Sequence, residues 1–296
     1  MKEPLELRRR RDFGQIINDS VTFLRENFKQ LFIPLLVICG FFIVIGTITS
    51  VFQYMGMMNI YSGLLSANSN SYEIPSYTVT YFVSVIFNVI ILVLLQTCVH
   101  LVTLCYISVY LQKGGIKPTF EEVWGYFRYY FFRVIGSGFL VVILTIFAAL
   151  LCFFPGIYLG NVLSLVIPII VIENSSFGYA FNKSFRLIKD NWWFVFGVVF
   201  ITSLIVTVIS SFASIPLTVL TLAGKFFSQK SFTLPLIILF SALKNILTLA
   251  YTLPVIALAL CYFNLSEQKE GLGLLDRIEK FGTGTDDNPN MPAEEY

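Results

Sequence analysis

Long apolar runs separated by short polar segments dominate the chain. Six runs are apolar over the roughly 20 residues that a helix needs to cross a bilayer, and they cover residues 31–58, 78–111, 134–154, 157–172, 194–223 and 235–263. Because lipid offers an exposed backbone no hydrogen-bond partner, such runs form helices. The fourth run begins near Pro155 and Gly156, which predicts a turn there and a tight hairpin with the third run. The pattern predicts an all-α, polytopic membrane protein with six transmembrane helices.

A second pattern, with apolar residues at helical spacing, comes just before three of these runs. Residues 12–32 and 176–196 align at a shift of 164 residues with six identities in 21 positions, and residues 120–131 repeat the spacing at a shift of 107. The apolar stripes are formed by Phe13, Ile16, Ile17, Val21, Leu24 and Phe28 in the first copy, by Phe120, Val123, Trp124, Phe127 and Phe131 in the middle copy, and by Phe177, Ala180, Phe181, Phe185, Ile188 and Trp192 in the last. The repeat predicts three related helices.

Charged residues occupy the face opposite each complete stripe: Asp19, Arg25, Glu26 and Lys29 in the first copy, and Lys183, Arg186, Lys189 and Asp190 in the last. Amphipathic helices of this kind lie in the membrane interface, although the apolar faces can equally pack on the protein's own loops, and both contacts can coexist. Capping boxes, Thr119 with Glu122 and more loosely Asp12 with Gln15, support the helix starts. The interface helices are marked by Phe13, Arg25, Asn27, Phe120, Trp124, Phe177, Lys189, Asn191 and Trp192.

The expected architecture is therefore three transmembrane hairpins, each preceded by an amphipathic helix on the cytoplasmic side. Residues 1–275 form a single membrane domain with repeat units at about 12–112, 119–172 and 176–266. Residues 276–296 are expected to be a flexible, acidic cytoplasmic tail, since their composition is polar and bears Gly and Pro.

Composition and charge support a membrane protein and set its orientation. Hydrophobic residues make up 56% of the chain and charged residues 13%, against about 45–50% and about 25% in soluble domains. The predicted segments on one side carry 17 Lys and Arg, and those on the other carry two. Since cytoplasmic loops carry the basic excess, both termini are expected in the cytoplasm of a bacterial inner membrane. Arg8 to Arg11 are interpreted as a topology determinant and a contact for anionic lipid.

Few polar residues fall inside the runs, and they attract the functional hypotheses. Asn88, Gln96, His100 and Thr103 share one face of the second run, which indicates either interhelical hydrogen bonds or a polar pathway with a proton-sensitive site at His100.

Two charged residues at the borders of runs have structural interpretations. Lys244 either snorkels outward or precedes a span that begins near Asn245. Glu173, at the end of the fourth run, is expected to pair with a basic residue such as Lys183.

The chemistry of an enzyme is not visible in the sequence. The five cysteines lie in apolar runs without CxxC spacing. With a single histidine, the sequence has few side chains suited to acid–base catalysis or metal ligation. No phosphate-binding loop, zinc motif or nucleophile elbow occurs. We expect no enzyme activity, no cofactor, no metal and no nucleic-acid binding; the expected partners are membrane lipids, including anionic ones, and the sequence identifies no protein partner.

Several motifs resemble a bacterial family of membrane domains. They are Pro155-Gly156-Ile157-Tyr158, the run 164–173, Ser184, Lys189-Asp190-Asn191-Trp192-Trp193 with Phe196-Gly197, and the ending Tyr262-Phe263 with Glu270-Gly271-Leu272. The chain is similar here to the membrane domain found beside glycerophosphodiester phosphodiesterases and to related inner-membrane proteins, over Asp12 to about Leu275. It departs from them at Asn264 and Ser266, where the family often carries Asp and Arg. The resemblance implies a polytopic inner-membrane protein, without the catalytic phosphodiesterase domain.

Two functions are compatible with these patterns. The leading hypothesis is a non-enzymatic protein that organises or senses the membrane, or assists a lipid or envelope process. The alternative is a transporter or channel for a small or amphipathic molecule, which would use the polar face of the second run.

Overall fold

A computed structural model describes residues 5–66, 76–223 and 230–271, and these residues are helical almost throughout, which confirms the all-α prediction. The acidic tail expected over 276–296 lies outside the described residues. The elements are α1 (Phe13–Glu26), α2 (Phe28–Ser66), α3 (Ser76–Gln112), α4 (Phe120–Leu151), α5 (Phe153–Ser164), α6 (Val166–Ile172), α7 (Phe177–Ile188), α8 (Trp192–Ala223), α9 (Lys230–Leu247), the 3₁₀ turn η1 (Thr248–Tyr251) and α10 (Thr252–Glu270).

Six helical segments within the described residues are long and apolar enough to cross a membrane. They are Phe28–Met58, Val79–Gln112, Phe120–Leu151, Phe153–Ile172, Trp192–Thr221 and Leu234–Glu270. Each of them overlaps one of the six apolar runs of the sequence. The chain is thus a polytopic integral membrane protein.

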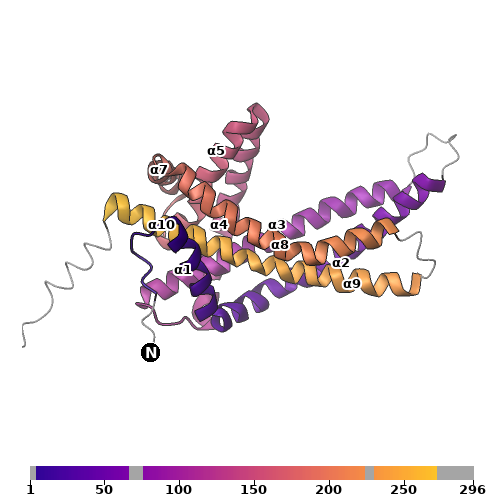
Figure 1. Ribbon diagram of the computed structural model, residues 1–296, viewed down its shortest axis with the longest axis horizontal. Coiled ribbons are helices and arrows are strands. Elements are labelled where there is room, and N and C mark those ends of the chain that lie inside the picture. The colour runs from indigo at the N-terminus through magenta and orange to yellow at the C-terminus, as the bar shows by residue number, and fades with distance from the viewer. Residues whose placement is uncertain (1–4, 67–75, 224–229, 272–296) are drawn as a thin grey trace, which may run out of the picture.

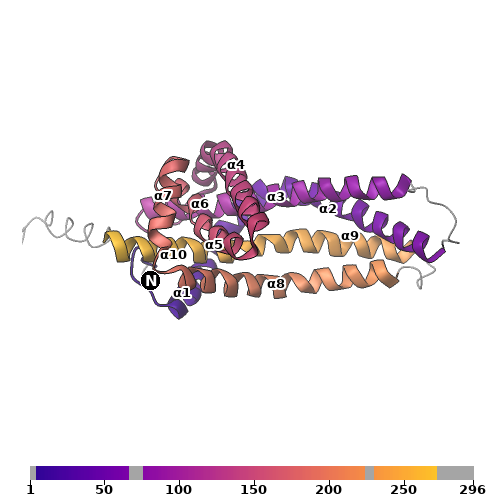
Figure 2. The ribbon, with the colours of Figure 1, turned by 90° about the horizontal axis from the view of Figure 1, so that it is seen from above.

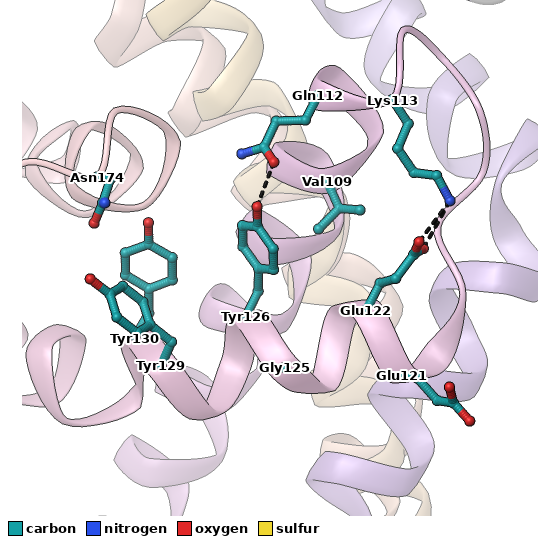
Figure 3. Close-up of a pocket in the computed structure, with 10 residues that line it drawn as sticks. All are labelled: Val109, Gln112, Lys113, Glu121, Glu122, Gly125, Tyr126, Tyr129, Tyr130 and Asn174. Carbon is teal, nitrogen blue, oxygen red and sulfur yellow. Dashed lines mark hydrogen bonds and ion pairs between the residues drawn. The ribbon is translucent and has the colours of Figure 1, made fainter.

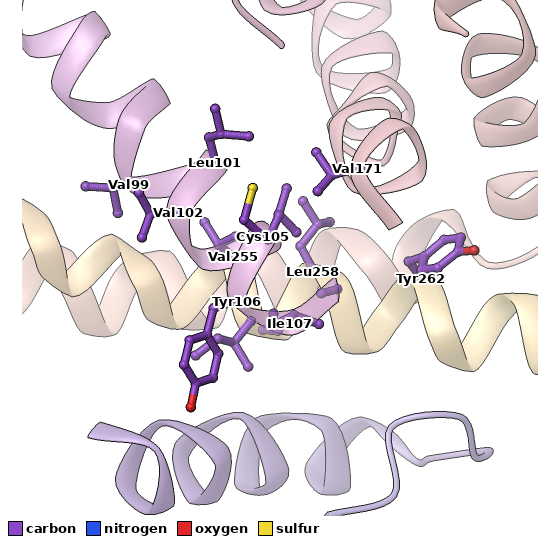
Figure 4. Packing of buried hydrophobic residues seen from close by; sticks show 14 of the residues in the cluster. Val99, Leu101, Val102, Cys105, Tyr106, Ile107, Val171, Val255, Leu258 and Tyr262 are labelled. Atoms are coloured by element: carbon purple, nitrogen blue, oxygen red, sulfur yellow. The ribbon is translucent and has the colours of Figure 1, made fainter. Parts of the chain in front are cut away.

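The long helices form an elongated bundle with a crowded end. In Figures 1 and 2, α2, α3, α8 and α9 run along the long axis, and α10 continues the line of α9. Helices α1 and α7 gather around α10 at one end, while the α4–α5 hairpin points away from the long axis in Figure 1. Figure 4 shows the core at the crowded end, where residues of α3 such as Val102 and Cys105 pack against Val171 of α6 and Val255 of α10.

The three copies of the repeat begin their helices at equivalent positions. Phe13, Phe120 and Phe177 are the first residues of α1, α4 and α7. Both capping boxes expected from the sequence are present, with Asp12 and Gln15 before α1 and Thr119 and Glu122 before α4.

The first and last copies break where the aligned asparagines lie, and the middle copy does not. Asn27 ends α1 before α2 starts at Phe28, and Asn191 lies between α7 and α8. Residues 120–131, expected to be a surface helix before a span, instead continue into that span as the single helix α4. No helix-ending residue separates the two parts in the sequence, so the backbone ladder runs on unbroken.

The hairpin between the third and fourth runs is tight, but its turn differs from the prediction. The chain reverses at Cys152, whose backbone is extended, and Pro155 and Gly156 lie in the first turn of α5. Proline is tolerated there because the first amides of a helix have no partner within it. A Cβ on Gly156 would lie 2.8 Å from the Cα of Ala149, so glycine allows the two helices to approach closely.

Two of the six segments are broken inside. Helix α5 gives way to α6 at Leu165, and Pro168 accounts for this break because it cannot donate to the carbonyl of Ser164. In the last segment, α9 and α10 are joined by η1, and Pro254 lies in the first turn of α10. Prolines thus set both breaks, and the second is relevant to the surface groove described below.

The outer surface of the bundle is strongly apolar. Of the 18 most apolar consecutive residues of α4 only 17% are buried, whereas 72% are buried in the corresponding stretch of the last segment. Phe132, Phe139 and Phe147 of α4 are each more than three-fifths exposed. An apolar surface of this extent is what a lipid-facing helix presents.

Candidate functional site at the polar end of the bundle

Several charged side chains at the crowded end are paired inside the protein. The Arg11 side chain is fully buried, and its Nε donates to Asp19 Oδ2 at 2.8 Å. Arg9 Nη2 reaches the same oxygen at 2.6 Å. The Arg11 backbone amide donates to Asn264 Oδ1 at 2.9 Å. Arg11 and Asp19 therefore fix the N-terminal segment on α1 and α10; the interpretation of Arg11 as a lipid contact was wrong.

Lys183 is likewise buried rather than exposed on the polar face of α7. Its Nζ lies 2.7 Å from Glu173 Oε1 and 2.7 Å from Glu270 Oε2, which confirms the predicted pair with Glu173. Arg186 Nη2 also contacts Glu270, at 2.6 Å, and the Tyr262 hydroxyl donates to Glu173. This ionic cluster ties α7 to α10 and to the end of α6.

The surroundings of these groups shift their ionisation. Burial alone would raise the pKa of Asp19, but hydrogen bonds from Arg11 and Arg9 outweigh it and lower that pKa below the ordinary value. Burial alone would lower the pKa of Lys183, but its two glutamate partners raise it. Each pair therefore favours the charged form, and the carboxylates are engaged by cations instead of being held ready for proton transfer.

A pocket of about 630 Å³ opens beside this end, between the last turn of α3 and the first half of α4. Figure 3 shows Tyr129, Tyr130 and Asn174 together at one side of it and the Lys113–Glu122 pair at the other. Gly125 forms part of its wall, and a Cβ there would meet nothing within 4 Å.

The pocket offers neutral hydrogen-bonding groups and aromatic faces. Lys113 Nζ is neutralised by Glu122 at 2.8 Å, and the Glu121 carboxylate points away in Figure 3. The Tyr126 hydroxyl donates to Gln112 Oε1. Such a wall can bind an uncharged or zwitterionic polar group by hydrogen bonds and ring contacts.

The polar face predicted on α3 is divided among separate local contacts. Asn88 is buried and donates to Thr49 Oγ1 at 2.9 Å and to Ser50 Oγ at 3.0 Å, both on α2. Gln96 and His100 contact each other at 3.0 Å. The Thr103 hydroxyl donates to the carbonyl of Val99 in its own helix. The structure brings Gln96 and His100 together but does not join them to Asn88 or Thr103.

Lys244 lies in α9 and turns toward α2. Its Nζ is 3.3 Å from the Tyr54 hydroxyl and 5.7 Å from the centre of the Tyr54 ring. The neighbouring Asn245 is fully buried and donates to the carbonyl of Ser241 at 2.9 Å. The contact with Tyr54 explains how a lysine is accommodated in this segment.

The residues predicted to mark the amphipathic helices have divergent environments. Asn27 is buried and accepts a hydrogen bond from Tyr106 at 3.0 Å, so the first copy is anchored to α3. Phe120 and Trp124 stack at 6.4 Å on the exposed side of α4. On α7 the Phe177 ring contacts the Phe181 ring, and the Trp192 ring stacks on Tyr158. Arg25 and Lys189 are exposed. Both expected kinds of contact, with the protein and with the exterior, therefore occur.

Three residues that contribute contacts or pocket walls at the crowded end were not predicted from the sequence. Asn161 Nδ2 donates to the Trp192 carbonyl at 3.1 Å, and so joins α5 to the first residue of α8. Tyr129 and Tyr130 of the pocket gave a faint signal, as two tyrosines beside the aromatic stripe of residues 120–131.

Within the described ranges, no three His, Cys, Asp or Glu side chains come together as a group that could hold a metal. Compared with known proteins, the chain matches no protein-family model, no curated protein and no solved structure.

Proposed function

We propose that this protein is a non-enzymatic membrane protein that binds polar lipid headgroups at the crowded end of its bundle and thereby organises or senses the membrane. The observation that carries the proposal is the pocket of about 630 Å³. It lies where α3 ends and the amphipathic part of α4 begins, the position of a headgroup relative to a spanning helix. The exposed stack of Phe120 and Trp124 belongs to the same helix, and aromatic rings favour the membrane–water interface. The likeness to the bacterial inner-membrane family noted from the sequence is compatible with this role.

We infer that the crowded end faces the cytoplasm of a bacterial inner membrane. Exposed basic residues at that end support this orientation, among them Arg10, Arg25, Lys29 and Lys189. A reporter enzyme inserted at Ser69, between α2 and α3, is expected to behave as extracytoplasmic. Cytoplasmic activity of that fusion would contradict the inferred orientation.

The pocket is tested by filling it. Gly125→Phe places a ring in the open space of the pocket, whereas Gly136→Phe, on an exposed face of the same helix, adds the same ring outside it. Both proteins are purified in a mild detergent, and co-purifying lipids are identified by native mass spectrometry. We expect one lipid class retained by the wild type and by Gly136→Phe to be lost from Gly125→Phe. Identical lipid complements in all three proteins would refute headgroup binding in the pocket.

A transporter is the second candidate, and one feature favours it. The buried polar side chains between α2, α3 and α9 include Ser241 Oγ and Asn245 Oδ1, which have no hydrogen-bond partner among the described residues. Flux of a small solute into proteoliposomes that falls on Gln96→Ala or His100→Ala would support this candidate and count against a purely organising role.

A further inference from the structure

A second cavity lies at the corner between α1 and α2. It is a groove of about 240 Å³, walled on one side by the end of α1 and the first two turns of α2 and on the other by the end of α9 and η1. The rings of Phe28 and Phe32 stack at 5.1 Å along its wall, and Leu35 and Leu249 line it as well. The lining is apolar except for Thr252. Its shape exists because the last segment breaks at η1, before Pro254.

Thr252 gives the groove one unsatisfied polar atom. The residue is 2% exposed, and its Oγ1 has no hydrogen-bond partner among the residues that the structure describes. Elsewhere in the bundle, Thr103 and Thr202 donate to the carbonyl four residues earlier. Thr252 follows a 3₁₀ turn, where that geometry is lost. A buried hydroxyl without a partner is costly, so a ligand with an acceptor at this depth would be stabilised.

Two exposed basic residues are adjacent in the sequence to residues that line the groove. Arg25 and Lys29 directly follow the lining residues Leu24 and Phe28, and both are exposed. Neither forms an ion pair in the part of the chain that the structure describes. Lys117 adds a third cation nearby, since its Nζ donates to the Glu26 carbonyl at 2.8 Å.

We propose that the groove binds one acyl chain of an anionic phospholipid, with the phosphate at Arg25 and Lys29 and an ester carbonyl accepting the Thr252 hydroxyl. The inference rests on the membrane placement proposed above, but it does not depend on the tyrosine-lined pocket. An apolar groove, a buried donor and a cationic rim match, in that order, the chain, the ester and the headgroup of such a lipid. Basic residues beside the cytoplasmic leaflet attract anionic lipids.

Native mass spectrometry of the purified full chain tests the site, by titration with phosphatidylglycerol and with phosphatidylcholine of identical acyl chains. Each surface cation contributes about fivefold to the binding of an anionic lipid, so two of them predict roughly a 25-fold preference for phosphatidylglycerol. The double variant Arg25→Gln/Lys29→Gln is expected to lose this preference. The matched control Arg10→Gln/Lys189→Gln removes two exposed cations at the same end, away from the groove, and should keep it.

A third variant distinguishes binding of the acyl chain and its ester from binding of the phosphate headgroup. Thr252→Val removes the hydroxyl without breaking any hydrogen bond between described residues, so the fold is retained. It should weaken the binding of both lipids while leaving the ratio of their affinities unchanged. The inference is overturned if Arg25→Gln/Lys29→Gln keeps the preference, if the control loses it equally, or if Thr252→Val leaves both affinities unchanged. Gly125→Phe should not alter the preference, so a failure of this site and a failure of the pocket are distinguishable.

Discussion

Replacing Asp19 by Asn tests whether the buried ion pair holds the N-terminal segment in place. Asp19 Oδ2 accepts from Arg11 Nε at 2.8 Å and from Arg9 Nη2 at 2.6 Å, and the Arg11 side chain is completely buried. Removing one partner of a buried pair costs about 3–5 kcal/mol, because it leaves a charge without compensation. Arg11 keeps the carbonyl of Leu7 at 2.7 Å, so we expect the lower end, about 3 kcal/mol.

Asp190 provides the matched control. Its carboxylate pairs with Lys269 at 2.9 Å, but its side chain is 70% exposed. Exposed pairs contribute about 0–1 kcal/mol, so Asp190→Asn should have little effect.

Hydrogen exchange followed by mass spectrometry measures the difference in local stability. A loss of about 3 kcal/mol corresponds to roughly 100-fold faster exchange, and it should be confined to residues 5–26 in Asp19→Asn. Equal exchange in the two variants would show that the Asp19 pair contributes no more than a surface contact, and the proposed anchoring of α1 would be refuted.

The remaining predictions concern packing, pH and access. Gly156→Ala should destabilise the protein by about 1–3 kcal/mol, measured by thermal unfolding, because its Cβ would meet the backbone of Ala149. The control Gly160→Ala, one turn further on, should be neutral or slightly stabilising. The reverse order of stabilities would contradict the close packing at Gly156. The raised pKa of Lys183 means that its ion pairs stabilise below the ordinary lysine pKa and are lost as the pH rises through the raised value, so Lys183→Met should lower the midpoint at neutral pH and remove this alkaline dependence; an unchanged pH profile would count against it. Cys152 is exposed and the other four cysteines are buried, so maleimide in detergent should modify one site, and Cys152→Ser should abolish the adduct.

Local signals in the sequence predicted the starts of helices well and their internal breaks less well. Phe120 opens a helix because the Thr119 side chain before it accepts a hydrogen bond from the Glu122 amide within the first turn. Phe13 and Phe177 open their helices after Asp12 and Ser176, which have extended backbones. The turn expected at Pro155 and Gly156 lies at Cys152, since proline fits the first turn of a helix as readily as a loop. The pair of Glu173 with Lys183 was predictable because the two residues are close in the sequence, while Glu270 completes the cluster from 87 residues away.

The sequence by itself determined that the chain spans a membrane, how many times it can do so, and that separate amphipathic helices precede the first and the fifth span. Hydropathy and capping depend on residues within a few turns of one another, so no partner element is needed to recognise them. Only the tertiary structure decided that Asp19 and Lys183 face inward, that the tyrosines of α4 form a pocket with α3, and that Thr252 lies in a groove beside Phe28. A charge on an amphipathic helix can face water or a buried partner, and which of these it meets depends on the segments that fold onto that helix. For Asp19 this is the N-terminal segment with Arg9 and Arg11, and for Lys183 it includes Glu270 of α10, 87 residues away.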